Sequence, residues 1–387
     1  MDFNLSEDEQ LLERTVRDFV AREYSFERRQ AIIESPEGWS RDVWRQLAEI
    51  GVLGVGVPAA CGGLDAGPVP AMLVMNAVGA ALVVEPVLTS AVVATALLRG
   101  VDDAEHRRDL LPAMAAGESI VALAHQEPET QHGAMSVATR AERTGAGYVI
   151  RGRKTVVAHA PAADTFLISA GIVGSAREAP GLSLFRVPRA TPGLKLARYR
   201  SLDGQVAGDL ELDAVELPAE ARVGPEHAAA SALGDALDVG VAAVCAEAVG
   251  ALAALLDTTA EYLRTRKQFG RPIGSFQALQ HRAADMLIHC EQAKSMSYLA
   301  TLRGLGADPR ERRRALSAAK VLIGRACRFV GQQAVQLHGG MGMTDELNVS
   351  HYFKRLTAIE LAFGDADFHL DRFIDTWREH PRPAEGA

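Results

Sequence analysis

The chain has 387 residues, of which 48% are hydrophobic and 23% charged, so it is too long for one small core and typical of a globular protein with two or three domains. The formal net charge is −8, and the densest basic run, residues 310–314, is interpreted as a solvated helix face, so nucleic-acid binding is not expected. The four cysteines are scattered without a C-x-x-C pair. Neither a disulfide framework nor a metal site is therefore expected, and the cytoplasm is the predicted location.

Residues 1–118 have the periodicity of packed helices. Ser6 and Glu9 have the spacing of a capping box, and a helical apolar face follows them. A second helix is predicted over residues 40–50, and it stops at Gly51. This part of the chain is therefore predicted to be an all-α domain.

The most apolar stretch of the chain covers residues 80–98. Glu85 and Pro86 interrupt it, so it indicates a buried helix rather than a membrane span. The first residues do not show a basic segment followed by an apolar one, so no signal peptide and no membrane association are expected.

Residues 119–225 change to short β-type runs separated by turn residues. The runs 137–143 and 148–151 flank the turn-forming tetrapeptide 144–147, which is typical of a β hairpin. Further strands are predicted over residues 165–170, 182–187 and 209–217. A β domain therefore lies between two helical ones.

From residue 226 to residue 387 the chain returns to long helical patterns. They are predicted over residues 228–266, 276–302, 309–337 and 345–377. Long helices with short connections favour a bundle. The predicted fold class is α+β and mainly α, with an all-α N-terminal domain (1–118), a middle β-barrel or β-sandwich domain (119–225) and a C-terminal four-helix bundle (226–387).

The first motif that suggests chemistry is Tyr262–Gln277, which reads YLRTRKQFGRPIGSFQ. Its cations, glycine and proline individually suit the end of a helix. That interpretation does not account for Gln268 and Phe269, or for Gln277.

The second motif, residues 336–342, reads QLHGGMG. It suits a helix end followed by a flexible turn. Taken alone, the motif favours this interpretation over the alternative, a glycine turn whose bare backbone can approach a cofactor diphosphate or adenosine. The second motif alone does not decide between these interpretations.

Taken together, the two motifs resemble the C-terminal domain of the acyl-CoA dehydrogenase family, and the resemblance covers essentially the whole chain in the same domain order. It implies an FAD-dependent flavoprotein of fatty-acid and lipid metabolism. It also implies α,β-dehydrogenation of an acyl-CoA substrate, with electrons passed to an electron-transfer flavoprotein. Because each flavin site of the family takes groups from two chains, the resemblance implies an oligomer such as a tetramer.

The resemblance also implies roles for residues of both motifs. Arg266 is expected to contact the FAD pyrophosphate of a neighbouring subunit, which suits a fixed guanidinium. The other residues that the resemblance places along this FAD are Gln268, Phe269, Gln277, Gln336, Gly339 and Gly340.

The middle domain departs from the family pattern at positions beside the flavin ring. Gln126 stands where a threonine usually precedes Glu-Pro, and Val156 and Ala158 stand where a tryptophan and a threonine are frequent. Backbone groups at these three positions can still hold the ring. The redox potential or the exposure of the flavin is therefore expected to differ from that of typical members.

The usual catalytic base is missing at both of its known locations. Dehydrogenation needs a base that takes a proton from the α carbon of the thioester. The resemblance places this base, a glutamate, at Phe363 or, in some relatives, at Gly240. Neither residue can accept a proton.

Nearby carboxylates are the remaining candidates for the base. They are Asp365, which lies just past Phe363, Asp238, which lies beside Gly240, and Glu247 and Glu360, which lie on the adjoining helices. For each of them the alternative is a solvated or capping carboxylate.

The pattern after Gly339 and again from Ser350 to Arg355 resembles the small subunit of pimeloyl-CoA dehydrogenases, a group in which some members are heteromers. Three hypotheses stay open. The chain is an acyl-CoA dehydrogenase subunit that is a homo-oligomer or works with a base-bearing partner chain. Alternatively, it is a flavin oxidase or monooxygenase on the same scaffold, or a non-catalytic subunit that completes a partner's FAD site.

Overall fold

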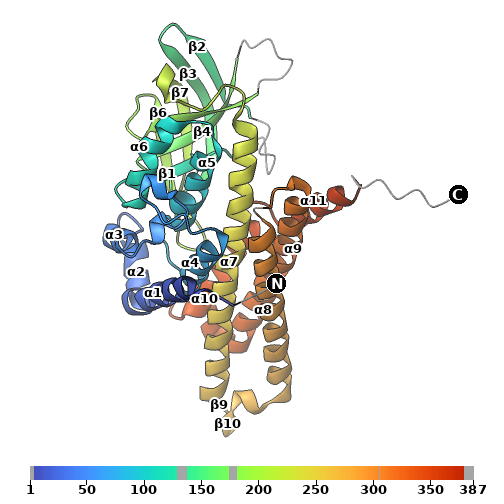
Figure 1. Cartoon of the computed structure of the whole chain (residues 1–387). Coiled ribbons are helices and arrows are strands. Elements are labelled where there is room, and N and C mark those ends of the chain that lie inside the picture. Colours follow the sequence, from blue (N-terminus) through green and yellow to red (C-terminus); the bar gives the residue numbers. More distant parts are fainter. Residues whose placement is uncertain (1–3, 129–136, 174–180, 305, 379–387) are drawn as a thin grey trace, which may run out of the picture. The chain divides into compact units, whose positions relative to one another are not determined.

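The computed structural model describes residues 4–128, 137–173, 181–304 and 306–378. The chain divides into two compact units (Figure 1). The first comprises Met1–Phe26, Pro68–Val83 and Val241–Ala387, and the second comprises Glu27–Gly67 and Val84–Gly240. The fold class is α+β and mainly α, as predicted.

The first unit is helical. Its elements are α1 (Glu7–Glu23), α4 (Pro68–Ala81), most of α7 (Ala229–Thr265), α8 (Gln277–Arg303), α9 (Pro309–His338), the short 3-10 helices η5 (Ile273–Ser275) and η6 (Gly339–Met343), α10 (Asn348–Leu361) and α11 (Ala366–Arg378). The capping box predicted at the start of α1 is present, since the Ser6 hydroxyl accepts from the amide of Glu9 and the Glu9 carboxylate accepts from the amide of Ser6. In Figure 1, α8 and α9 run side by side.

Glycines let α4 and α7 cross at close range. A Cβ atom on Gly79 would lie 1.9 Å from the carbonyl oxygen of Glu247, and one on Gly250 would lie 1.9 Å from that of Asn76. Any side chain at either glycine would therefore force the two helices apart.

Helix α7 is the one helix of the described residues that is long and apolar enough to cross a membrane by length and composition. Of its most apolar window, 67% is buried inside the protein, which is the behaviour of a core helix. The stretch 80–98, for which a buried helix was predicted, is broken at Glu85 and Pro86, where α4 has ended and the π-helix η3 (Val87–Ala94) has not begun.

The single helix predicted over residues 345–377 is wrong. The structure has two helices, α10 and α11, separated by the turn Ala362–Asp365. Phe363 has a φ of +58° and Gly364 a φ of +103°, and two consecutive left-handed residues cannot continue a right-handed helix. The apolar periodicity runs on through the break, which is why it predicted one helix.

The second unit combines short helices with a sheet. The helices are α2 (Phe26–Glu34), α3 (Arg41–Glu49), the 3-10 turns η1 (Val52–Gly54), η2 (Ala59–Cys61) and η4 (Ala219–Ala221), the π-helix η3, α5 (Thr95–Gly100) and α6 (Ala104–Ala115). The strands are β1 (Val121–Ala124), β2 (Arg140–Thr144), β3 (Gly147–Ala158), β4 (Thr165–Ile172), β5 (Leu182–Pro188), β6 (Leu194–Arg200), β7 (Val206–Pro218) and β8 (Arg222–Val223).

The sheet has the order β6-β7-β3-β2-β4-β5-β8, and β1 pairs in parallel with β4. The predicted hairpin is confirmed: β2 and β3 pair antiparallel from Arg140–Arg151 to Thr144–Gly147. Strands β1 and β6 were not predicted. Strand β1 is buried throughout, so it lacks the alternation that marks a strand, and β6 is an exposed edge strand rich in basic residues.

Candidate functional site

The connection between α7 and α8 carries the first motif. Here β9 (Lys267–Gln268) and β10 (Arg271–Pro272) pair antiparallel, and Phe269 and Gly270 form the turn with φ values of +55° and +79°. Two positive φ angles in a two-residue loop are typical of a type I′ hairpin. The ring of Phe269 is 90% exposed.

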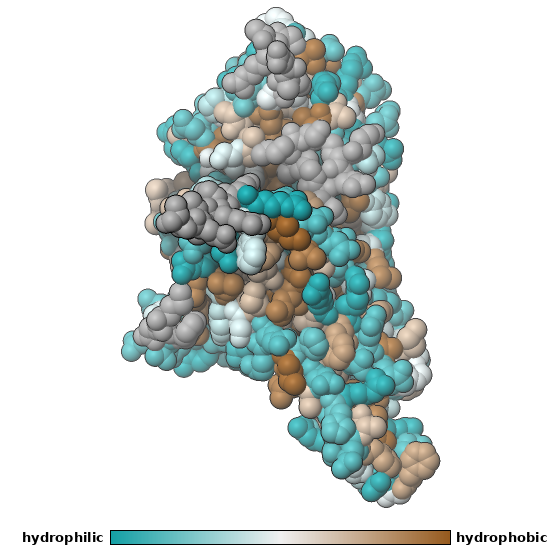
Figure 2. All heavy atoms as spheres, turned by 90° about the vertical axis from the view of Figure 1, so that its right-hand side faces the viewer, coloured by the Kyte–Doolittle hydropathy of each residue, from teal (hydrophilic) through white to brown (hydrophobic). Residues whose placement is uncertain are grey.

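This ribbon is the tip at the bottom of Figure 1, and Figure 2 shows the same tip as mostly hydrophilic with paler, more apolar residues at its end. Phe269 combines a left-handed backbone conformation with an aromatic side chain exposed to solvent, which is uncommon on the surface of a monomeric protein. The geometry suits a residue that meets another molecule.

The two motifs meet in the first unit. The rings of Tyr262, near the end of α7, and His338, at the end of α9, stack with centroids 4.2 Å apart and planes inclined by 28°. His338 is also fixed to its own helix, since its Nδ1 lies 2.8 Å from the carbonyl oxygen of Ala334. The segment that follows Tyr262 and the glycine turn that follows His338 therefore lie at the same end of this unit.

The residues at this end fit a dinucleotide. Arg266 is exposed, and within the described part of the chain its guanidinium has no hydrogen bond or ion pair. A Cβ atom on Gly339 or Gly340 would meet nothing within 4 Å, so both glycines present open backbone. An exposed guanidinium and unobstructed backbone at the same end of one unit are donors that suit a diphosphate. The remaining predicted FAD residues of this unit are exposed as well: Gln268, Gln277 and Gln336.

In the second unit, a bulge in β3 presents Val156. The pairing of β3 with β7 shifts register between Lys154 and Val157, and Val156 has a φ of +51° and is 60% exposed. Its amide donates to Oδ1 of Asp209 on β7 at 3.0 Å, which holds the bulge. Ala158 is exposed on the same strand. Sequence reasoning missed Asp209, because a carboxylate on a β-strand has no local signal for such a role.

The segment with Gln126 lies beside this strand, since the carbonyl of Gln126 accepts from the amide of Thr155 at 3.0 Å. The segment is also held by the buried residue that follows Gln126, Glu127. Its Oε1 accepts from Nζ of Lys154 at 2.7 Å and from the hydroxyl of Thr139 at 2.6 Å. Burial lowers the pKa of Lys154 to about 8, against the opposing effect of the Glu127 carboxylate. The three middle-domain positions predicted to face the flavin thus belong to one supported surface.

The two positions where the resemblance places the base lie in different parts of the first and second units. Phe363 sits in the turn between α10 and α11, and Gly240 is buried on α7. Asp238 is also buried on α7. Phe363 and Gly240 themselves carry no carboxylate, and the carboxylate of Asp238 lies two residues from Gly240.

The candidate base Glu247 forms a buried ion pair with Arg355. Its Oε1 and Oε2 accept from Nε and Nη2 of Arg355 at 2.6 and 2.8 Å, and the glutamate is 1% exposed. This bidentate buried pair joins α7 to α10. Both oxygens are engaged, so Glu247 would have to break the pair before it could accept a substrate proton.

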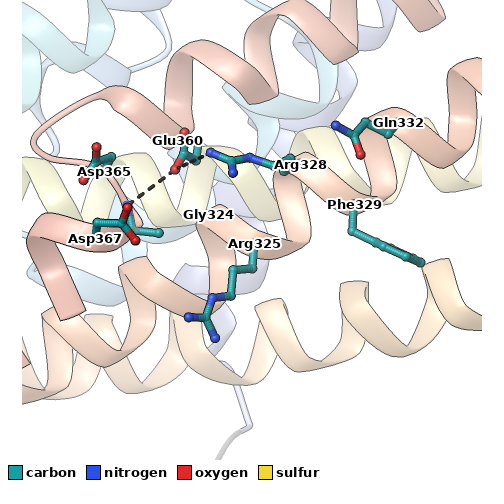
Figure 3. Close-up of a pocket in the computed structure, with 9 residues that line it drawn as sticks. Gly324, Arg325, Arg328, Phe329, Gln332, Glu360, Asp365 and Asp367 are labelled. Atoms are coloured by element: carbon teal, nitrogen blue, oxygen red, sulfur yellow. Dashed lines mark hydrogen bonds and ion pairs between the residues drawn. The ribbon is translucent and has the colours of Figure 1, made fainter.

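Asp365 and Glu360 line a cavity of about 290 Å³ between α9, α10 and α11 (Figure 3). Oδ1 of Asp365 accepts from the amide of Phe368 at 2.8 Å, as an N-cap of α11. Glu360 accepts from Arg328 at 3.3 Å. The other polar lining residues are Arg325, Gln332 and Asp367. The cavity wall therefore mixes guanidinium groups with carboxylates, and the two candidate bases that reach it are Asp365 and Glu360.

The described residues contain no cluster of three or more His, Cys, Asp or Glu side chains that could hold a metal ion.

Comparison with known proteins agrees with this arrangement. Residues 6–118, 122–215 and 231–375 match the N-terminal, middle and C-terminal domains of acyl-CoA dehydrogenases. The chain is 31% identical to acyl-CoA dehydrogenase FadE12 of Mycobacterium tuberculosis over 363 residues, which cover 89% of each chain. It is 28% identical to caffeyl-CoA reductase-Etf complex subunit CarC of Acetobacterium woodii over 356 residues, covering 90% of this chain and 92% of that one.

Among solved structures, one chain of the ChsE4-ChsE5 complex from Mycobacterium tuberculosis superimposes with a TM-score of 0.87 at 29% identity. The superposition covers 98% of this chain and 100% of that one. The domain matches span nearly the whole described chain in the order that the sequence predicted. The chain therefore belongs to the acyl-CoA dehydrogenase family, whose members are oxidoreductases that act on CH–CH groups.

Proposed function

We propose that this protein is an FAD-dependent acyl-CoA dehydrogenase subunit that removes hydrogen from the α and β carbons of an acyl-CoA thioester. The observation that carries the proposal is the stacking of Tyr262 on His338. It brings an exposed Arg266 and the open backbone of Gly339 and Gly340 to one end of a single unit. FAD is the cofactor of this family, and these groups suit its diphosphate.

The chemistry divides between the cofactor and the chain. FAD, when bound, supplies the acceptor for the hydride that leaves the β carbon. The chain orients the thioester, and a base takes the α proton. In unit 2, the bulge at Val156 and the backbone of Gln126 are proposed to lie along the flavin ring, while Arg266, Gln268, Phe269, Gln277 and Gln336 are proposed to hold the flavin of a second chain.

The identity of the base favours a two-chain enzyme. Phe363 and Gly240 cannot accept a proton, and Glu247 is held by Arg355. Of the other candidates in this chain, Asp238 and Glu360 are buried, and Asp365, which is half-buried, is engaged as a helix cap. We therefore propose a heteromer with a second acyl-CoA dehydrogenase-type chain that supplies the base, consistent with the pimeloyl-CoA small-subunit resemblance. The similarity to a chain of the ChsE4-ChsE5 complex supports this assembly.

An electron-transfer flavoprotein is the proposed electron acceptor, because the similar CarC is a subunit of a reductase-Etf complex. The cytoplasm is the proposed location. The proposed domain boundaries remain 1–118, 119–225 and 226–387.

The test is to purify the chain alone and after co-expression with the family member encoded nearest to it. Bound FAD is quantified, and bleaching of its visible absorbance by acyl-CoA esters is followed without oxygen. We expect flavin and bleaching in the co-expressed complex. Absence of flavin from both preparations, even with added FAD, would contradict the proposal.

The alternative functions give different results in the same experiment. A flavin oxidase or monooxygenase on this scaffold predicts rapid reoxidation of the reduced flavin by oxygen, whereas a dehydrogenase reoxidises slowly without its acceptor. A non-catalytic subunit predicts that substitutions in this chain, Arg266→Gln included, lower only the flavin content and leave the rate of bleaching per bound flavin unchanged.

A further inference from the structure

A buried lysine on α9 holds the main chain where α10 ends. Lys320 is 1% exposed, and its Nζ donates to the carbonyl oxygens of Glu360 at 2.8 Å and of Gly364 at 2.7 Å. The last carbonyls of a helix have no partner within the helix, and a cation is favourable beside them. Burial lowers the pKa of Lys320, so placing an ammonium here has an energetic cost. The lysine offsets that cost by bonding to two carbonyls on either side of the turn.

A buried histidine on α11 holds the carbonyl between them. His369 is fully buried, and its Nε2 lies 3.0 Å from the carbonyl oxygen of Phe363. Because a carbonyl only accepts, Nε2 carries the hydrogen, and Nδ1 is left to accept from the Ser317 hydroxyl at 3.4 Å. Ser317 precedes Lys320 by one turn of α9 and lies on the same buried face. Side chains from α9 and α11 therefore hydrogen-bond to the main-chain carbonyls of residues 360, 363 and 364.

The backbone conformation that these hydrogen bonds hold is one that the local sequence does not favour. Phe363 has a φ of +58°, a conformation that costs a residue with a side chain about 1 kcal/mol. Gly364 follows at +103°, and a Cβ atom there would lie 2.3 Å from the Phe368 ring. Such a conformation persists only where surrounding contacts over-determine it, and Lys320 and His369 supply those contacts.

We propose that Lys320 and His369 are positioning residues: they fix the turn Ala362–Asp365 so that residue 363 leaves it in one direction, whichever side chain it carries. The inference rests on the proposed function in one respect, since that function places Phe363 where the family's base stands. It follows that this chain keeps the turn that presents a base although it has lost the carboxylate.

The direct test needs neither flavin nor substrate. 4-Fluorophenylalanine is introduced at position 363, and the fluorine NMR spectrum of the full chain is recorded for the parent and for Lys320→Met, His369→Leu and His369→Gln. One narrow resonance is expected for the parent. Lys320→Met and His369→Leu are expected to broaden or split it, and His369→Gln, which keeps an N–H donor, is expected to restore much of the parent spectrum.

The matched control is Lys294→Met, which removes an exposed lysine from α8. It should leave the fluorine resonance unchanged. A parent-like spectrum in folded Lys320→Met and His369→Leu would overturn the proposal. If Lys320→Met does not fold, the two histidine variants decide the question, because a spectrum that is equally narrow in both contradicts a positioning role.

The second measurement joins the turn to the chemistry. Phe363→Glu is expected to raise the rate of α-proton exchange from a bound acyl-CoA into deuterated water by about a hundredfold, the usual effect of a general base. Adding Lys320→Met should remove most of that gain while the Kd for the acyl-CoA stays the same. Equal rates with and without Lys320 would overturn the positioning role. No gain from Phe363→Glu, together with an altered fluorine spectrum in Lys320→Met, would leave the positioning role standing and count against the proposed function instead.

Discussion

The buried pair between Glu247 and Arg355 gives the sharpest prediction about stability. Its two hydrogen bonds, 2.6 and 2.8 Å long, are charge-assisted, and the partners are 1% and 8% exposed. Two such bonds correspond to about 3–6 kcal/mol. Glu247→Met leaves a buried guanidinium without its carboxylate, so we expect the free energy of unfolding to fall by about 3–5 kcal/mol, and by a similar amount for Arg355→Met.

The double variant should behave differently from the sum of the single ones. With both charges gone, no charge stays buried without a partner, and methionine fills much of the space, so a loss below about 2 kcal/mol is expected. The assay is urea unfolding followed by circular dichroism at one fixed protein concentration, because the stability of an oligomer depends on concentration.

Two results would refute this reasoning. One is a loss below about 1 kcal/mol in either single variant, and the other is a double variant that is as unstable as the two losses added together. The same double variant also tests the chemistry. If Glu247 is the base, the folded double variant binds flavin but no longer exchanges the α proton; if the pair is structural, exchange continues.

Three further predictions concern the cofactor and acid stability. Arg266→Gln should weaken FAD binding by about tenfold to a hundredfold, as expected for the loss of one charged contact, whereas Arg264→Gln on the same helix end should not; equal Kd values in fluorescence titrations would contradict the assignment of Arg266. Gly340→Ala should leave the thermal midpoint of the flavin-free protein nearly unchanged, because nothing lies within 4 Å of the new Cβ, yet weaken FAD binding by about tenfold, since a methyl group blocks the backbone. Finally, the hydrogen bond from Arg143 lowers the pKa of Glu226 from 4.5 to about 2, so its stabilising contribution is present above pH 4.5 and lost as the pH falls toward 2. Glu226→Gln should therefore reduce the dependence of the free energy of unfolding on pH between 4.5 and 2. An unchanged pH dependence would show that the pair of Arg143 and Glu226 does not contribute to acid stability.

Local rules predicted the parts of the fold whose causes are local. The capping box at Ser6, the hairpin over β2 and β3 and the stop of α9 all depend on residues a few positions apart. The break at Phe363 could not be predicted in this way, because distant residues hold that backbone. Gly364 was the only local sign of it.

In the candidate site, too, the features with local causes could be predicted from the sequence and those held by distant residues could not. The motifs around Arg266 and Gly339 were visible as sequence patterns, but the stacking that joins them is a tertiary contact. Lys320 was missed because a lysine in a helix is ordinarily exposed. Its signal was its place on the apolar face of α9, beside Ala319 and Ile323, where a charge needs a buried partner.

The turn Ala362–Asp365 and the absence of a carboxylate at position 363 bear on the proposed two-chain enzyme. A strained main chain and a buried ammonium each have an energetic cost, which the hydrogen bonds of Lys320 to the carbonyls of Glu360 and Gly364 offset. The proposed two-chain enzyme gives this turn a use that does not depend on a carboxylate at position 363. If Asp365 were the base, each protonation of its carboxylate would weaken the cap that its Oδ1 forms with the amide of Phe368. A base on a second chain requires no such change, because the turn of this chain would then only need to place Phe363 as an apolar surface of fixed direction. That difference favours the two-chain enzyme over an unusual base within this chain.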